Sequence, residues 1–253
     1  MTWNPVTGCT KVSQGCKHCY AERMARRLQA MGLERYRNGF GVTLHEDLLE
    51  EPMKWSKPRT VFVNSMSDLF HEMVPVEFIL RVFETMTRCP EHVFQVLTKR
   101  SGRLKRVASQ LPWPDNVWMG VSVEDVRAAA RIADLVCVPA RVRFLSCEPL
   151  IGPLGKLPLE RIHWVIVGGE SGPGARPMKE EWVESVLQQC RRVEIPFFFK
   201  QWGGIWKKRM GRKLNGRTYD ELPAVQRRIR MPGDNQPVPT EVRADLAEVL
   251  RCT

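Results

Sequence analysis

Residues 117–123 read Val117-Trp-Met-Gly-Val-Ser-Val123, one of six short apolar runs that decide the fold. Nearly continuous apolarity over four to six residues is typical of strands covered on both faces, as in parallel sheets. The six predicted strands are residues 60–63, 93–98, 117–123, 142–146, 164–167 and 196–200. Residues 2–4 and 42–45 are weaker strand candidates.

Stretches with helical spacing follow most of these runs. The expected helices cover residues 19–31, 76–88, 102–110, 126–136 and 179–193. Alternation of strands and helices indicates parallel βαβ units. We therefore predict an α/β fold, a complete or partial TIM-like (β/α) barrel over residues 1–205. An open doubly wound sheet is the alternative, although no Gly-x-Gly-x-x-Gly motif follows the first strand.

The remaining residues, 206–253, are predicted to form a basic C-terminal extension with a short helix at about 240–250. Residues 206–230 contain nine Lys or Arg and two acidic residues, a net +7 of the chain's +11. Such a cluster attracts polyanions, most obviously nucleic acid. A solvated arm without a ligand is the alternative. The candidate nucleic-acid contacts here are Lys207, Lys208, Arg209, Arg212 and Lys213.

Composition narrows the class of protein. The 253 residues are 43% apolar and 26% charged, which fits one large domain or two small ones. No apolar run approaches the roughly 20 residues of a membrane helix. The first residues do not resemble a signal peptide, so we expect a cytoplasmic, non-membrane protein. In a reducing compartment most of the scattered cysteines should be small buried apolar residues. These are Cys89, Cys137, Cys147, Cys190 and Cys252.

Polar residues directly follow the predicted strands. In a (β/α) barrel these loops open on one face, where active sites are built. Asp68 and Glu148 are candidates for binding ribose hydroxyls or substrate, and Lys99, Arg100 and Lys200 for binding an anionic substrate. Other exit residues are helix-cap candidates, Ser122 and Glu124 among them.

Three cysteines, Cys9, Cys16 and Cys19, form a Cys-x6-Cys-x2-Cys pattern near the start of the chain. Structural zinc sites require four closed ligands, and His18 could be the fourth only in a cramped geometry. Three cysteines are also the ligands of a four-iron cluster that keeps one iron open. Glycines directly precede Cys9 and Cys16, which frees the backbone to wrap around such a cluster.

This region resembles the radical SAM enzymes, which place three cysteines after the first barrel strand as Cys-x3-Cys-x2-Cys. Here the first interval is three residues longer, and His18 takes the place of an aromatic residue. The longer loop costs only about 0.5 kcal/mol of closure entropy. Gly168-Gly169-Glu170 also spells the triplet that holds the methionine amine in that family, although here it follows a late strand. The alternative for Gly168 and Gly169 is that they only shape a strand-to-loop turn.

A closer resemblance covers nearly the whole chain. Its motifs are Trp3-Asn-Pro-Val-Thr-Gly-Cys, Gly15-Cys-Lys-His-Cys-Tyr-Ala-Glu, Asn64-Ser-Met-Ser-Asp-Leu-Phe, Leu97-Thr-Lys-Arg, Val117-Trp-Met-Gly-Val-Ser-Val-Glu, Phe144-Leu-Ser-Cys-Glu-Pro-Leu, Val167-Gly-Gly-Glu-Ser-Gly and Phe199-Lys-Gln-Trp-Gly. They are similar to the phage Gp37/Gp68 family, also called the three-Cys-motif or DUF5131 family. The resemblance implies a radical-SAM-type barrel, a [4Fe-4S] cluster and S-adenosylmethionine. It also implies a reductant and a separate partner protein. Compared with the family, this copy begins slightly late, so we expect its first strand to be clipped.

Three functions follow as hypotheses. The first is a radical SAM-type enzyme that acts on nucleic acid or a nucleotide. The second is a zinc-stabilised nucleic-acid-binding protein without redox chemistry. The third is a metal-assisted hydrolase that uses Asp68, Glu148 and Glu170.

Overall fold

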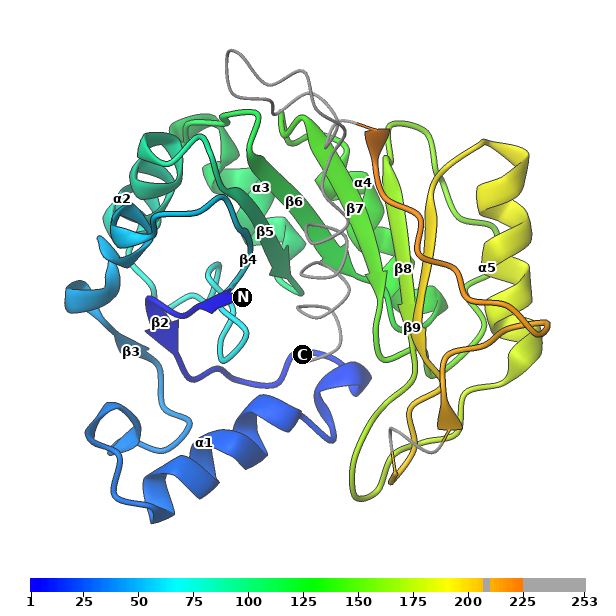
Figure 1. Cartoon of the computed structure of the whole chain (residues 1–253), viewed down its shortest axis with the longest axis horizontal. Coiled ribbons are helices and arrows are strands. Elements are labelled where there is room, and N and C mark those ends of the chain that lie inside the picture. The colour runs from blue at the N-terminus through cyan, green and yellow to red at the C-terminus, as the bar shows by residue number, and fades with distance from the viewer. Residues whose placement is uncertain (207–209, 225–253) are drawn as a thin grey trace.

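A curled parallel sheet forms the centre of the computed structural model, which describes residues 1–206 and 210–224. Its seven strands lie in the order β1, β4, β5, β6, β7, β8, β9, and each pairs in parallel with the next. They are β1 (Thr2–Trp3), β4 (Thr60–Val63), β5 (Val93–Thr98), β6 (Val117–Ser122), β7 (Val142–Cys147), β8 (Trp164–Gly168) and β9 (Phe197–Gln201). The sheet curls into a half-barrel (Figure 1). All six strongly predicted strands are confirmed to within one residue.

The positions of the helices and the order of the strands show that the sheet is not doubly wound. The helices are α1 (Tyr20–Ala30), α2 (Val76–Arg88), α3 (Ser101–Val107), α4 (Arg131–Leu135) and α5 (Glu180–Arg192). Helices α2 to α5 follow the outer, convex side of the sheet (Figure 1). A doubly wound sheet needs a reversal of strand order, with helices on both faces. The sequential order has no reversal, so that alternative is wrong.

One weak strand prediction has a different outcome. β3 (Thr43–Leu44) lies in the predicted 42–45 stretch, but it pairs antiparallel with β2 (Val6–Thr7) in a separate two-stranded ribbon. Pro5 lies between β1 and β2 and has no N–H to donate to a continuing ladder. Its carbonyl instead accepts from the His45 N–H at 2.8 Å. The ribbon therefore branches off the half-barrel just before the cysteine loop.

Short 3-10 turns complete the described part of the chain. They are η1 (Gln14–Cys16), η2 (Glu34–Tyr36), η3 (Glu46–Leu48), η4 (Glu51–Lys54), η5 (Ala108–Gln110) and η6 (Val126–Ala130). The helix predicted at 126–136 is therefore η6 followed by α4. Asp125 caps η6 by accepting from the Arg127 and Ala128 N–H groups, so the cap expected at Ser122 or Glu124 was wrong.

Apolar side chains fill both sides of the sheet. The larger core lies between the sheet and its helices. A smaller, aromatic core fills the lower interior of the half-barrel. In it, Trp118 and Trp164 meet edge to face with ring centroids 6.1 Å apart. A Cβ on Gly120 would lie 2.4 Å from the Phe144 ring, so this glycine makes room for that ring. The interior is thus filled by side chains towards the amino ends of the strands, and its cavity lies towards their carboxyl ends.

Residues 210–224 pack against the β9 side of the sheet. Phe198 and Asp220 form an antiparallel bridge, and the Trp164 indole N–H donates to the Glu221 carbonyl at 2.9 Å. Leu214 and Tyr219 are buried in the larger core. Lys207, Lys208, Arg209, Cys252 and the predicted helix at 240–250 lie outside the described residues. Within the described part, no helix is both long and apolar enough to cross a membrane.

Candidate functional site

A cavity of about 250 Å³ opens at the carboxyl ends of the parallel strands. The cysteine loop, residues 8–19, covers one side of it and brings Cys9, Cys16 and Cys19 to its wall. Side chains from the strand ends form the rest. The predicted site residues in this wall are the three cysteines, His18, Asp68, Lys99, Glu148, Gly169, Glu170 and Lys200. Folding therefore gathers into one cavity residues that are more than 190 positions apart in the sequence.

Glu124 holds the cysteine loop at Ser13, in the middle of the loop. Its side chain is 1% exposed, accepts from the Ser13 hydroxyl at 2.8 Å and pairs with Arg131 at 2.7 Å. A Cβ on Gly15 would lie 2.5 Å from the Glu124 carboxylate, so only glycine allows this approach. Removal of one partner of a buried ion pair leaves the other charge buried and uncompensated. Substitution of Glu124 or Arg131 should therefore destabilise the attachment of the cysteine loop.

Arg100 holds the cysteine loop near its start, at Thr10. Its guanidinium donates to the Thr10 carbonyl at 3.1 Å and to the Thr10 hydroxyl at 2.8 Å, and lies 3.9 Å from the Cys9 sulfur. It also pairs with Glu72. Arg100 does not line the cavity, although it was predicted to bind an anion there. These contacts use its charge to hold the loop.

Burial, followed by the nearby charge of Asp68, raises the pKa of Cys9 to about 11, although Arg100 acts in the opposite direction. The thiol is therefore protonated at neutral pH and is a poor nucleophile. A metal that binds it must displace the proton, so binding should strengthen as the pH rises.

The donor set fits an iron–sulfur cluster in its chemistry. The three thiols are free and share one cavity. Among residues 1–206 and 210–224, no three His, Cys, Asp or Glu side chains are placed to hold one metal ion. A four-iron cluster distributes its cysteines over separate irons, so it does not need them converged on a single ion.

Glu170 lies in the cavity wall but already has a partner. Its carboxylate accepts from the Arg176 side chain at 2.6 and 2.8 Å and from the Arg176 backbone N–H at 3.0 Å. An incoming ammonium group would have to share this carboxylate, so its predicted role in cofactor binding stays a prediction. Sequence reasoning missed Arg176, which lies six residues beyond Glu170 in a loop without a motif.

The two glycines of the triplet have packing reasons for being glycine. A Cβ on Gly168 would lie 2.8 Å from the Glu148 carboxylate. A Cβ on Gly169 would lie 1.9 Å from the Trp202 carbonyl oxygen. The alternative that these residues shape the strand exit is thus supported by geometry.

The Glu170–Arg176 pair predicts a pH dependence of stability. Burial alone would raise the pKa of Glu170, but the Arg176 hydrogen bonds and charge outweigh it and lower that pKa below 4.5. The pair's contribution is therefore fully present above about pH 4.5 and is lost as the pH falls through the lowered pKa. Glu170→Gln should cost about 2 kcal/mol of unfolding free energy at pH 7, as for a hydrogen bond to a charged group, and much less at pH 3.

Urea unfolding at both pH values measures this difference. Glu181→Gln is the matched control, because Glu181 pairs with Lys179 at 3.5 Å where both side chains are largely exposed. It should change stability little at either pH. A cost for Glu170→Gln that is the same at pH 7 and pH 3 would contradict the assignment.

The remaining charged residues of the wall also have polar partners. Asp68 accepts from the Thr98 hydroxyl at 2.7 Å and the Lys99 N–H at 3.0 Å, which ties the β4 exit to the β5 exit. Lys99 donates to the Ser122 hydroxyl at 3.0 Å. Lys200 pairs with Glu148 at 3.0 Å. The wall therefore presents both positive and negative groups, which suits a ligand with both charges.

The loop after β8 closes the open side of the half-barrel. Arg23 of α1 donates to the Ser171 carbonyl at 2.9 Å and the Pro173 carbonyl at 3.1 Å. Arg176 donates to the Gln14 carbonyl at 2.9 Å, and Gly174 packs against the His18 ring. The cysteine loop and the β8 exit are thus joined across the cavity mouth.

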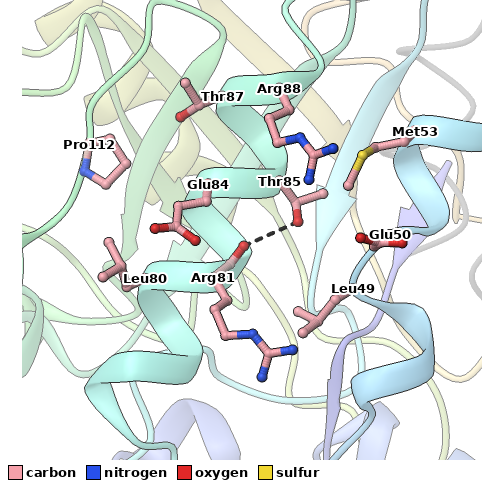
Figure 2. A pocket seen from close by; sticks show the side chains of 10 residues that line it. All are labelled: Leu49, Glu50, Met53, Leu80, Arg81, Glu84, Thr85, Thr87, Arg88 and Pro112. Atoms are coloured by element: carbon pink, nitrogen blue, oxygen red, sulfur yellow. Dashed lines mark hydrogen bonds between the residues drawn. The ribbon is translucent and has the colours of Figure 1, made fainter.

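A second, larger hollow of about 580 Å³ lies on the outside of the molecule, along α2. Figure 2 shows its charged side chains, Glu50, Arg81, Glu84 and Arg88, and the Thr85 hydroxyl donating to the Arg81 carbonyl at 3.1 Å. No residue from the carboxyl ends of the strands lines it. Three of its charges, Arg81, Glu84 and Arg88, belong to the solvent-facing side of α2, so we place the functional site at the cysteine cavity.

The other predictions have mixed outcomes. Cys89, Cys147 and Cys190 are buried, as expected, whereas Cys137 is exposed. In the basic segment, Arg212 pairs with Asp220 and lies over the Phe198 ring at 5.3 Å, so it helps to hold residues 210–224 against β9. Lys213 is exposed.

Comparison with known proteins gives a family but no described relative. No curated protein and no solved structure matches the chain. The profile of a family described as a protein of unknown function, DUF5131, matches residues 1–223, which include every strand and the whole cysteine cavity. The chain therefore belongs to the DUF5131 family.

Proposed function

We propose that this protein is an iron–sulfur enzyme of the radical SAM type that acts on nucleic acid or a nucleotide. The observation that carries the proposal is the shared cavity. Three thiols from a loop after the first strands line it together with the carboxyl ends of the parallel strands. Active sites of (β/α) barrels are built on this face. The curled, sequentially ordered sheet supports a radical SAM-type barrel that is only half closed.

In this proposal Cys9, Cys16 and Cys19 hold a [4Fe-4S] cluster, with S-adenosylmethionine bound beside it. Bound there, such a pair would supply reductive cleavage of the sulfonium C–S bond and hence radical chemistry for hydrogen abstraction. A reductant must supply the electron for this cleavage.

The chain's own residues position and shield the site. Arg100 holds the cysteine loop at Thr10 and Glu124 holds it at Ser13, which restricts the positions of the sulfur atoms. Arg23 and Arg176 join the β8 exit to α1 and the cysteine loop, which limits access of water from the open side. A reactive species in the cavity needs such exclusion of water. Lys99 and Lys200 lie in the wall together with the carboxylates of Asp68, Glu148 and Glu170, so the wall offers partners to a ligand that carries both charges.

Charge supports nucleic acid as the substrate class. The chain carries a net charge of +11, and the densest run of Lys and Arg begins directly after the strand β9 exit. A phage Gp37/Gp68 identity and a three-Cys-motif partner protein belong to the same proposal.

Anaerobic purification tests the proposal most directly. We expect a brown protein with about four irons per chain after reconstitution, and reductive cleavage of S-adenosylmethionine. A colourless protein with one zinc per chain would instead support a zinc-stabilised binding protein. A four-iron protein that does not cleave S-adenosylmethionine under reducing conditions would overturn the assigned chemistry.

A further inference from the structure

The floor of the cysteine cavity contains a buried carboxamide without a partner. Gln95 lies in β5, lines the cavity and is 1% exposed. Among the described residues, neither its Oε1 nor its Nε2 has a hydrogen-bond partner. Buried side-chain polar atoms in native proteins nearly always have a partner, so each exception requires an explanation.

A second amide in the same wall has the same property. Asn64, at the exit of β4, is 4% exposed. Its Oδ1 accepts from the Val6 N–H at 3.2 Å, but its Nδ2 has no partner in the described part of the chain. The two amides come from neighbouring strands, because β4 pairs with β5. They leave two NH2 groups and one carbonyl oxygen unused around one cavity.

Packing does not account for Gln95. The inward positions in the lower interior of the neighbouring strands carry apolar residues, such as Trp118, Phe144 and Ile166. An apolar residue at position 95 would leave fewer unpaired polar atoms in this interior, where the Trp118 indole N–H, in register with Gln95, also has no partner among the described residues. The carboxamide is therefore explained by a ligand.

The surroundings of Gln95 define the shape and polarity of that ligand. Phe62, Phe144, Leu97 and Ile166 line the cavity with it, so the ligand has apolar faces. A carboxamide presents a donor and an acceptor side by side. Its complement is a planar group with an adjacent acceptor and donor, as on the edge of a nucleobase.

Depth separates this position from the cysteine loop. Gln95 lies three residues before Thr98, the last residue of β5, which at about 3.3 Å per residue places it roughly 10 Å below the strand end. A cofactor held beside the cysteines would occupy the upper layer. The floor is left for the substrate.

We propose that Gln95, assisted by Asn64, recognises the edge of a heterocyclic base in the substrate. Assignment of that base to a substrate rests on the proposed function. The base-binding site itself requires no cluster.

Calorimetric titration of the metal-free full-length chain with adenosine, cytidine, uridine and guanosine tests the inference. At least one nucleoside should bind, and Gln95→Met should weaken that binding roughly 10- to 100-fold, as for loss of a bidentate base contact. The same variant should have an equal or higher Tm, because it removes an unpaired buried amide. Gln110→Met is the matched control at an exposed position of η5 and should leave binding unchanged.

A second variant keeps the test decisive if Gln95→Met does not fold. Gln95→Glu preserves the shape but offers two acceptors, so preference should move towards guanosine, whose edge presents two adjacent donors. No nucleoside binding, or equal binding by the wild-type and both variants, would overturn the inference.

Titration with S-adenosylmethionine separates the two sources of a base. If Gln95→Met weakens binding of S-adenosylmethionine and adenosine alone, the base is the cofactor's and the inference is overturned. If nucleosides bind through Gln95 but the reconstituted protein does not cleave S-adenosylmethionine, the base site stands and the proposed chemistry fails.

Discussion

Replacement of Cys16 by alanine should abolish iron binding and S-adenosylmethionine cleavage. The Cys16 sulfur lies in the cavity wall, 3.7 Å from the Ser13 hydroxyl. The side chain is only partly buried, so its loss should cost little stability. A cluster with two remaining protein ligands should not assemble, because each cysteine holds a separate iron. Iron content, visible absorption and cleavage of S-adenosylmethionine measure the result after identical anaerobic reconstitution.

Cys137→Ala is the matched control for this experiment. Cys137 is exposed, lies next to α4 and donates to the Ala133 carbonyl at 3.3 Å. It is not part of the cavity wall, so its variant should bind iron and cleave S-adenosylmethionine as the wild-type does. Full iron content and cleavage in Cys16→Ala would remove this residue from the proposed cluster.

Gly8→Ala should destabilise the protein by more than about 3 kcal/mol, because it combines two costs. Gly8 has a φ of 83°, in the left-handed region that side chains disfavour. A Cβ there would also lie 2.1 Å from the Gly41 carbonyl oxygen. The two backbone segments cannot move apart freely, because hydrogen bonds hold them. The Gly8 N–H donates to the Met66 carbonyl at 2.9 Å, and the Cys9 N–H donates to the Phe40 carbonyl at 3.1 Å.

Gly32→Ala is the control that separates the two costs, because it carries the backbone cost without the clash. Gly32 has a φ of 75°, but nothing lies within 4 Å of a Cβ placed on it. It should lose only the backbone term, about 1 kcal/mol. Urea unfolding of both variants gives the difference, which we assign to the clash with Gly41. Similar losses in the two variants would show that the cysteine loop tolerates displacement of residues 40–41.

The strands were predictable because their signal is local. Short, largely apolar runs such as Thr60–Val63 and Val93–Thr98 match β4 and β5 residue for residue. The run at 42–45 carries the same kind of signal, yet it pairs outside the main sheet. Which strand is its partner depends on the path of the chain around Pro5, and residue preference does not encode that path.

The candidate site was predictable in part for a related reason. Polar residues after the strands share one face in a parallel barrel, so their gathering follows from topology. Their individual pairings do not. Glu170 is held by Arg176 and Arg100 by Glu72 and Thr10, and these contacts join loops that no motif connects. Gln95 had a readable signal, a single polar residue inside the apolar strand Val93-Phe-Gln-Val-Leu-Thr98, which sequence reasoning did not use.

The sequence alone determined the strand and helix alternation, the parallel sheet and the three-cysteine loop, because each is written in residues close together along the chain. Only the tertiary structure decided that the barrel is half closed, that α1 and the β8 exit meet across its open side, and that Gln95 is unpaired on the cavity floor. These features depend on distances between segments far apart in the sequence. Such distances follow from how the whole core packs.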